Sequence, residues 1–118
     1  MEDELLTILE SFKYPVFRQG SMNNDAPYPE TFVTYRRIGS PDHAYYDNGD
    51  FGTNWDYSVY IYSSDVSTCY SLTENIRTAL KNASWIVPSK GYDIQSDEDT
   101  HIGLGLDCYF LQTPSTNN

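Results

Sequence analysis

Few side chains in this chain of 118 residues could carry acid–base or nucleophilic chemistry. There are two histidines, His43 and His101, and two cysteines, Cys69 and Cys108. Neither histidine sits in a nucleophile elbow or an HExxH motif, and the chain has no glycine-rich phosphate loop. The sequence also has no pair of CxxC motifs, a spacing typical of structural zinc sites. We therefore predict no catalytic, metal-binding or cofactor-binding residue, and a protein that is not an enzyme.

Two acidic stretches, residues 47–50 and 97–99, are rich in the oxygen ligands that hard cations prefer. Neither has the spacing of a calcium-binding loop. Counted from Asp47, the twelfth position is Ser58, where such a loop places a bidentate glutamate. We interpret both stretches as solvated turns.

The excess of acidic over basic residues limits the kinds of partner that this protein could bind. Seventeen acidic and seven basic residues give a formal net charge of -10. This argues against a protein that grips duplex DNA, since such binding requires clustered Lys and Arg. The sequence contains no run of 18 apolar residues, so we expect no membrane span. Residues 1–4 are acidic, whereas a secretory signal peptide begins with basic residues. We expect synthesis in a reducing cytosol and free thiols; a secreted protein with a Cys69–Cys108 disulfide is the alternative.

Periodicity predicts a short helix at the start and a second one after the N-cap candidates Ser63, Ser64 and Asp65. Trp55, Tyr57, Val59 and Ile61 alternate with more polar residues, which is typical of a half-buried strand. The predicted order is helix, strand, two-strand hairpin, helix, two-strand hairpin, with segments at 2–12, 16–18, 31–38, 55–62, 66–83, 91–95 and 102–110.

These elements predict one α+β domain spanning residues 1–118, with a polar tail at 113–118 that frays. Few βαβ crossovers are available, so we expect a mostly antiparallel sheet of four to five strands with two helices on one face. A long β-hairpin insert spans about residues 40–54. In the core we expect one strand to pack on the second helix, Ile102, Leu104, Leu106 and Phe110 against Val66, Cys69, Ile76 and Leu80.

Aromatic residues and glycines point to an interface. Eleven tyrosines are present, and Tyr57, Tyr60 and Tyr62 share one strand. Gly103 and Gly105 leave one face of the last strand bare, which favours close approach by another surface; a bulged or flexible strand entry explains them equally well. In the insert, rigid aromatic rings would anchor a contact with a neighbouring subunit. The candidate interface residues are Tyr45, Tyr46, Phe51, Tyr60, Tyr62, Gly103 and Gly105.

The order of segments resembles that of one known family. A first helix is followed by Tyr14-Pro15-Val16, and a loop then leads into the strand 28–35. A polar insert, the strand 57–63, a helix containing residues 72–80 and a last apolar strand complete the pattern. Over about residues 4–111 the chain is similar to the tail-terminator, or tail-completion, proteins of long-tailed bacteriophages and prophages, which join head to tail.

This resemblance implies a structural virion protein, assembled in the host cytoplasm, that forms a homohexameric ring. The ring would cap the tail-tube protein, stop tail polymerisation and dock on the head-completion or neck protein. DNA would pass through the lumen without sequence-specific binding, and acidic walls would repel its backbone. No membrane and no cofactor are implied. The alternatives are a neck or head-completion (stopper or adaptor) protein of the same particle and, from another class, a small ligand-binding module.

Overall fold

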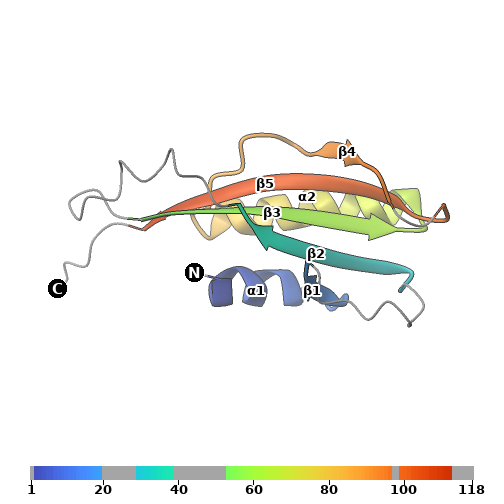
Figure 1. Cartoon of the computed structure of the whole chain (residues 1–118), viewed down its shortest axis with the longest axis horizontal. Helices are drawn as coiled ribbons and strands as arrows, with labels where there is room; N and C mark the ends of the chain where they lie inside the picture. The colour runs from blue at the N-terminus through green and yellow to red at the C-terminus, as the bar shows by residue number, and fades with distance from the viewer. Residues whose placement is uncertain (1, 20–28, 39–52, 97–98, 113–118) are drawn as a thin grey trace.

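The computed structural model describes residues 2–19, 29–38, 53–96 and 99–112. Two helices and five strands follow one another in the predicted order (Figure 1). They are α1 (Glu2–Glu10), β1 (Val16–Arg18), β2 (Thr31–Arg37), β3 (Thr53–Ser63), α2 (Val66–Asn82), β4 (Tyr92–Ile94) and β5 (Ile102–Gln112).

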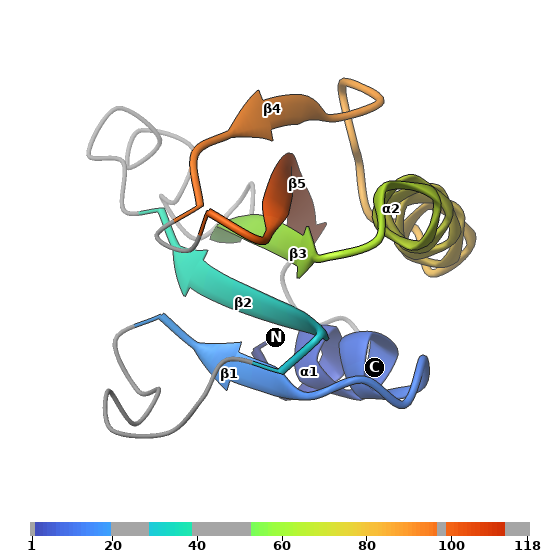
Figure 2. The same ribbon diagram turned by 90° about the vertical axis from the view of Figure 1, so that its right-hand side faces the viewer.

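The five strands form one sheet in the order β1-β2-β3-β5-β4. β1 runs parallel to β2, and every other neighbouring pair is antiparallel. Both helices lie on the same side of this sheet, as Figure 2 shows. The predicted α+β class, with a mostly antiparallel sheet and two helices packed on it, is confirmed. The order of the strands in the sheet was not predicted. After β3, α2 carries the chain across the sheet, so that β4 forms at the edge and β5 later fills the place between β3 and β4.

The middle of the sheet is the pair β3 and β5. These strands are matched over their whole length, from Thr53 opposite Gln112 to Ser63 opposite Ile102. Each is eleven residues long. Their shared register fixes which side chains lie side by side on each face, because successive residues of a strand point to opposite faces.

Asp65 sets the start of α2. Its carboxylate accepts a hydrogen bond from the backbone N–H of Thr68 at 3.0 Å and one from the Thr68 hydroxyl. This is the N-cap arrangement, which satisfies backbone donors that the first helical turn leaves free. The two bonds, that from the hydroxyl first, hold the pKa of Asp65 below its usual value.

The core lies between the sheet and the helices. β3 and β5 alternate as predicted: Leu106 and the neighbouring Val59 are both fully buried. α2 contributes Cys69, Leu72, Thr73, Ile76 and Leu80, and α1 contributes Leu5 and Leu9. Ile102 and Phe110 pack against the edge of this core.

One core prediction is wrong: the side chain of Val66 is 52% exposed. Val66 is the first residue of α2. Helical side chains lean toward the N-terminus of their helix, so this side chain leans past the end of the sheet instead of over it.

Two hydrogen bonds from the sheet hold the first residue of α1 in place. Glu2 accepts hydrogen bonds from Arg18 of β1 at 2.5 Å and from the Tyr35 hydroxyl of β2 at 3.0 Å. The bond from Arg18 is the main reason why the pKa of Glu2 lies below its usual value. The start of the helix is therefore fixed against the two strands at one edge of the sheet.

Candidate functional site

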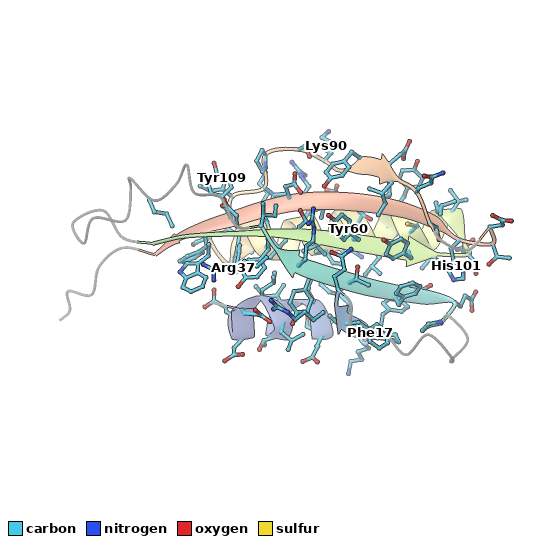
Figure 3. The ribbon with its side chains drawn as sticks, viewed as in Figure 1. Phe17, Arg37, Tyr60, Lys90, His101 and Tyr109 are labelled. Carbon is cyan, nitrogen blue, oxygen red and sulfur yellow. The ribbon has the colours of Figure 1, made fainter. Side chains whose placement is uncertain are left out.

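The face of the sheet opposite the helices is called here the open face, and Figure 3 looks onto it. Every second residue of the strands points to it. The register aligns these residues in rows that cross the sheet. One row joins Phe32, Tyr62, Gly103 and Ile94, and the next joins Thr34, Tyr60, Gly105 and Tyr92. A third joins Arg36, Ser58 and Asp107.

One end of the open face is aromatic. The rings of Phe32 and Tyr62 are stacked with centroids 4.9 Å apart, and Phe17 of β1 meets Phe32 edge-on at 6.4 Å. The His101 ring lies 5.9 Å from the Phe32 ring, and its Nε2 is 2.8 Å from the carbonyl oxygen of Pro29. Phe32 is only 2% exposed. These rings form a second, smaller apolar cluster outside the main core.

The other end of the open face is polar. The Arg36 guanidinium donates to the Tyr60 hydroxyl at 3.1 Å. The Asp107 carboxylate accepts from the Ser58 hydroxyl and from the Tyr92 hydroxyl, both at 2.8 Å. Burial, followed by the bond to Asp107, raises the pKa of Tyr92 to about 12. Four strands are thus linked by side chains, and the Arg36 side chain is exposed to solvent.

The two glycines of β5 lie under side chains of β4. A Cβ atom on Gly105 would lie 2.6 Å from the Tyr92 ring, and one on Gly103 would lie 2.7 Å from Ile94. The close approach that the sequence predicts therefore exists, and the approaching surface belongs to the same chain. A contact of Gly103 and Gly105 with a second copy stays a prediction.

The other candidate interface residues divide into two groups. Tyr60 and Tyr62 lie on the open face and are half-buried. Tyr45, Tyr46 and Phe51, with His43, fall outside the described residues, as do the acidic stretch 47–50 and most of the stretch 97–99.

Sequence reasoning missed the links from Tyr92 and Ser58 to Asp107. Alternation along each strand could have placed these residues on one face, but only the register brings them together. The adjacent residues Arg36 and Arg37 of β2 have different partners: Arg36 bonds Tyr60, and the Arg37 guanidinium lies 4.6 Å from the centre of the Trp55 ring.

Both cysteines are buried on the helix-covered side of the sheet and are free thiols. The Cys69 thiol donates to the Ile61 carbonyl at 3.5 Å. Burial raises the pKa of Cys69 to about 11 and that of Cys108 to about 12. Since the thiolate is the nucleophile, burial keeps both groups in the less reactive thiol form in the folded chain.

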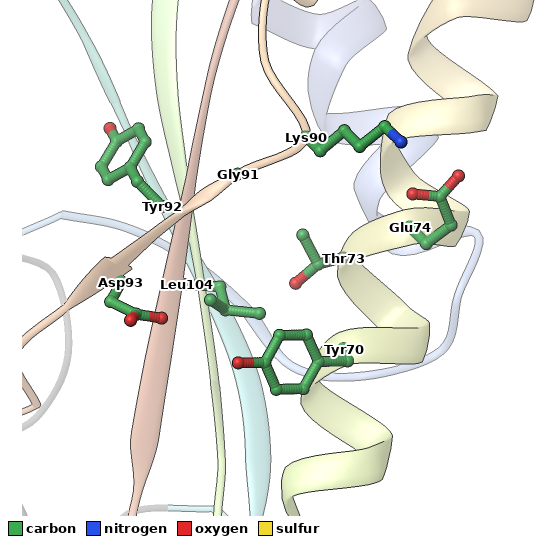
Figure 4. A pocket seen from close by; sticks show the side chains of 8 residues that line it. All are labelled: Tyr70, Thr73, Glu74, Lys90, Gly91, Tyr92, Asp93 and Leu104. Atoms are coloured by element: carbon green, nitrogen blue, oxygen red, sulfur yellow. The ribbon is translucent and has the colours of Figure 1, made fainter.

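A shallow groove separates α2 from β4, and we call it the α2–β4 groove. Its volume is about 510 Å³, and it is lined by Tyr70, Thr73, Glu74, Lys90, Gly91, Tyr92, Asp93 and Leu104 (Figure 4). Gly91 has a φ of +118° and passes close to β5, where a Cβ would be 3.4 Å from the Gly105 carbonyl oxygen. A second groove, of about 410 Å³, runs between Phe12 and Tyr14 and the first turns of α2.

Within the ranges given above, no three His, Cys, Asp or Glu side chains come together in a way that could hold a metal ion. Neither of the two described helices is long and apolar enough to cross a membrane. Comparison of the chain with models of known protein families and with curated protein sequences finds no match.

Proposed function

We propose that the chain is a structural protein that works by self-association through the open face. The observation that supports this best is the asymmetry of the sheet. Helices cover one face, and the other presents half-buried tyrosines, the exposed Tyr92 and the exposed Arg36 on one surface. Aromatic residues and arginine are the types enriched in the buried centres of protein interfaces.

The specific form of the proposal is a tail terminator of a long-tailed phage or prophage. The chain would form a homohexameric ring in the virion, cap the tail tube, end its polymerisation and join it to the head. The order of segments, which resembles that family, supports this form. The net charge of -10 also suits a ring through which DNA must pass without adhering.

The mass of the assembly in solution tests the proposal. Light scattering across a wide concentration range should reveal a species near six times the 13.5 kDa of one chain, and electron microscopy should show rings. Because a ring of this kind can require the tube as a template, the chain is also added to polymerising tail-tube protein. Tubes should then stop growing. A chain that neither forms rings nor stops tube growth contradicts the proposal.

A matched pair of variants tests whether the open face is the surface through which copies of the chain associate. Tyr60→Lys places a charge in the centre of the open face, whereas Tyr14→Lys places the same charge on an exposed tyrosine outside it. Loss of assembly in the first variant only, with both chains folded by circular dichroism, is the expected outcome. Equal effects would remove the open face from the interface.

A neck or head-completion protein of the same particle is the nearest alternative. It would also form rings, but it would bind the head and leave tube growth unchanged. A small ligand-binding module would need a pocket in which polar groups converge on a ligand. A module of that class that used one of the two grooves described above would bind its ligand there while the chain stays monomeric.

A further inference from the structure

The open face carries opposite charges on two sides of its central strand. Arg36 of β2 and Asp107 of β5 are both register partners of Ser58 in β3, so all three lie in one row. Two strand spacings, about 9.5 Å, separate the backbones of the two charged residues. Both charged side chains are exposed, whereas Ser58 between them is only 2% exposed. The row therefore presents one cation and one carboxylate to solvent.

A tyrosine hydroxyl holds each of these charges. The Arg36 guanidinium donates from Nε to the Tyr60 hydroxyl at 3.1 Å, and the Tyr92 hydroxyl donates to Asp107 at 2.8 Å. We call Arg36 with Tyr60 the Arg36 unit and Asp107 with Tyr92 the Asp107 unit. The first spans β2 and β3, and the second spans β5 and β4. Because both charged side chains are already held, they lose less rotamer freedom when a partner binds.

Both charged groups still have hydrogen-bonding capacity. Arg36 bonds through Nε, which leaves its two terminal amino groups without an acceptor among the described residues. Asp107 accepts from Ser58 and Tyr92 at the same oxygen, Oδ1, so its Oδ2 has no donor within the described part of the chain. In those ranges neither Arg36 nor Asp107 forms an ion pair.

A second copy of the chain offers a partner for each group. Guanidinium and carboxylate groups fit one another through paired N–H···O bonds. A ring requires two different patches on every copy, each of which fits the other patch on the next copy. We propose that the Arg36 unit of one copy binds the Asp107 unit of the next, head to tail, through an Arg36–Asp107 ion pair. This inference rests on the proposed self-association through the open face and names the contact that would join neighbouring copies.

The mixed charge of this face favours a copy of itself over other partners. Among the described strand residues that point to the open face, Arg36 is the only lysine or arginine, and the acidic ones are Asp107 and the half-buried Asp56. One arginine is too few for a nucleic acid backbone, which requires clustered basic residues. An acidic partner would place its charge beside Asp107, and a basic partner would place its charge beside Arg36. The same face in a second copy can meet each charge with its opposite.

Charge reversal tests this contact. Arg36→Asp places carboxylates in both units, and Asp107→Arg places guanidinium groups in both. Each variant alone should need a chain concentration about tenfold higher or more to assemble, because like charges would meet between copies. Ring formation is the readout, or arrest of tube growth if the tube is needed as a template. High salt should weaken assembly of the wild-type chain.

An equimolar mixture of the two variants tests whether the charges meet between copies. The two chains can alternate around a ring, so that opposite charges meet at every contact. Rings should therefore return, and native mass spectrometry should find equal numbers of the two chains in each ring. Neither an unfolded chain nor an ion pair within one chain could produce this rescue. Both changes combined in one chain should also restore rings of that chain alone.

Two changes outside the open face are matched controls. Asp93→Arg makes the same charge change on β4, but Asp93 alternates with Tyr92 and Ile94 and lines the α2–β4 groove. Lys90→Asp reverses an exposed basic residue of the same groove. Neither control should change the concentration at which the chain assembles.

The outcomes distinguish this inference from the proposed function. Wild-type assembly by both reversed chains would overturn the inference and leave self-association standing, as would a mixture of folded variants that stays monomeric. A mixture that yields only dimers, with one chain of each kind, would show a two-fold contact and overturn the head-to-tail arrangement. A wild-type chain that neither forms rings nor stops tube growth contradicts the proposed function, and the inference fails with it.

Discussion

The two faces of the sheet are built from the same strands but differ in their packing. On the helix-covered face, Val59, Ile61 and Leu106 are fully buried beneath α1 and α2. On the open face, the cover consists of side chains from the sheet itself: Tyr62 lies on Phe32, and Tyr92 lies over Gly105. One face therefore stabilises the fold through apolar burial, and the other keeps aromatic and charged groups at the surface.

Truncation of a side chain on the helix-covered face should have the largest effect. Leu106→Ala should lower the free energy of unfolding by about 2–5 kcal/mol, because it leaves a cavity beneath the helices. Denaturant titration measures the loss. Asp107→Ala, one position along on the open face, removes two hydrogen bonds at an exposed residue and should cost less. A cost below roughly 1 kcal/mol for Leu106→Ala would mean that the two faces have been exchanged.

A methyl group added to the open face should have an intermediate effect. Gly105→Ala brings a Cβ to within 2.6 Å of the Tyr92 ring, so the ring must move away from Asp107. Overpacking of this kind costs about 1–3 kcal/mol, at the lower end where the ring can swing toward solvent. In a Tyr92→Ala background the same substitution should cost almost nothing. An undiminished cost there would show that the strain lies in the backbone.

Alkaline pH should weaken the contacts that Tyr92 makes on the open face. The pKa of Tyr92 is raised from its ordinary value of 10.0 to about 12, chiefly by burial and then by its bond to Asp107. Folding therefore favours the protonated hydroxyl. The resulting stability is complete below pH 10 and declines between about pH 10 and 12. Tyr92→Phe should remove this part of the pH dependence, and the tyrosinate absorbance difference between the two chains should report the same pKa. A midpoint near 10 would contradict the partial desolvation of this hydroxyl and its bond to Asp107.

The two cysteine thiols should stay unreactive until the helix-covered face of the sheet unfolds. Cys69 and Cys108 have pKa values raised to about 11 and about 12, so a thiol reagent should react with neither in the folded chain at neutral pH. Both should react at the rate of unfolding once denaturant is added. Reducing and non-reducing gels of the denatured chain should be identical. A mobility shift would indicate a disulfide and favour the secreted alternative.

The elements of this fold could be predicted because each depends on local pattern. Alternation along β3 correctly separated Tyr57 and Val59 from Tyr60 and Tyr62, and one of the three N-cap candidates, Asp65, is the residue that starts α2. The strand order and the parallel pairing of β1 could not be predicted, since periodicity assigns a residue to a face but does not name its neighbour.

The same limit applies to the candidate site. The sequence named Tyr60, Tyr62 and the two glycines of β5 as candidate interface residues, and the register places them on one face. The sequence did not reveal that Tyr92 of β4 would cover Gly105 or bond Asp107, because this requires the register between two strands and the short edge strand beside them. Val66 was misplaced for a related reason: helical periodicity does not say where the sheet beneath the helix ends.

The pairing of β3 with β5 has a consequence for synthesis on the ribosome. Ser63 pairs with Ile102, 39 positions later, whereas β2 can pair with β3 as soon as their hairpin has emerged. Until β5 is made, one edge of β3 has unpaired backbone groups beside the apolar side chains Val59 and Ile61. At a translation rate of about 5–20 residues per second, this edge stays open for about two to eight seconds. Nascent chains on neighbouring ribosomes could pair through it during that interval, so co-translational aggregation should depend on how fast this stretch is translated.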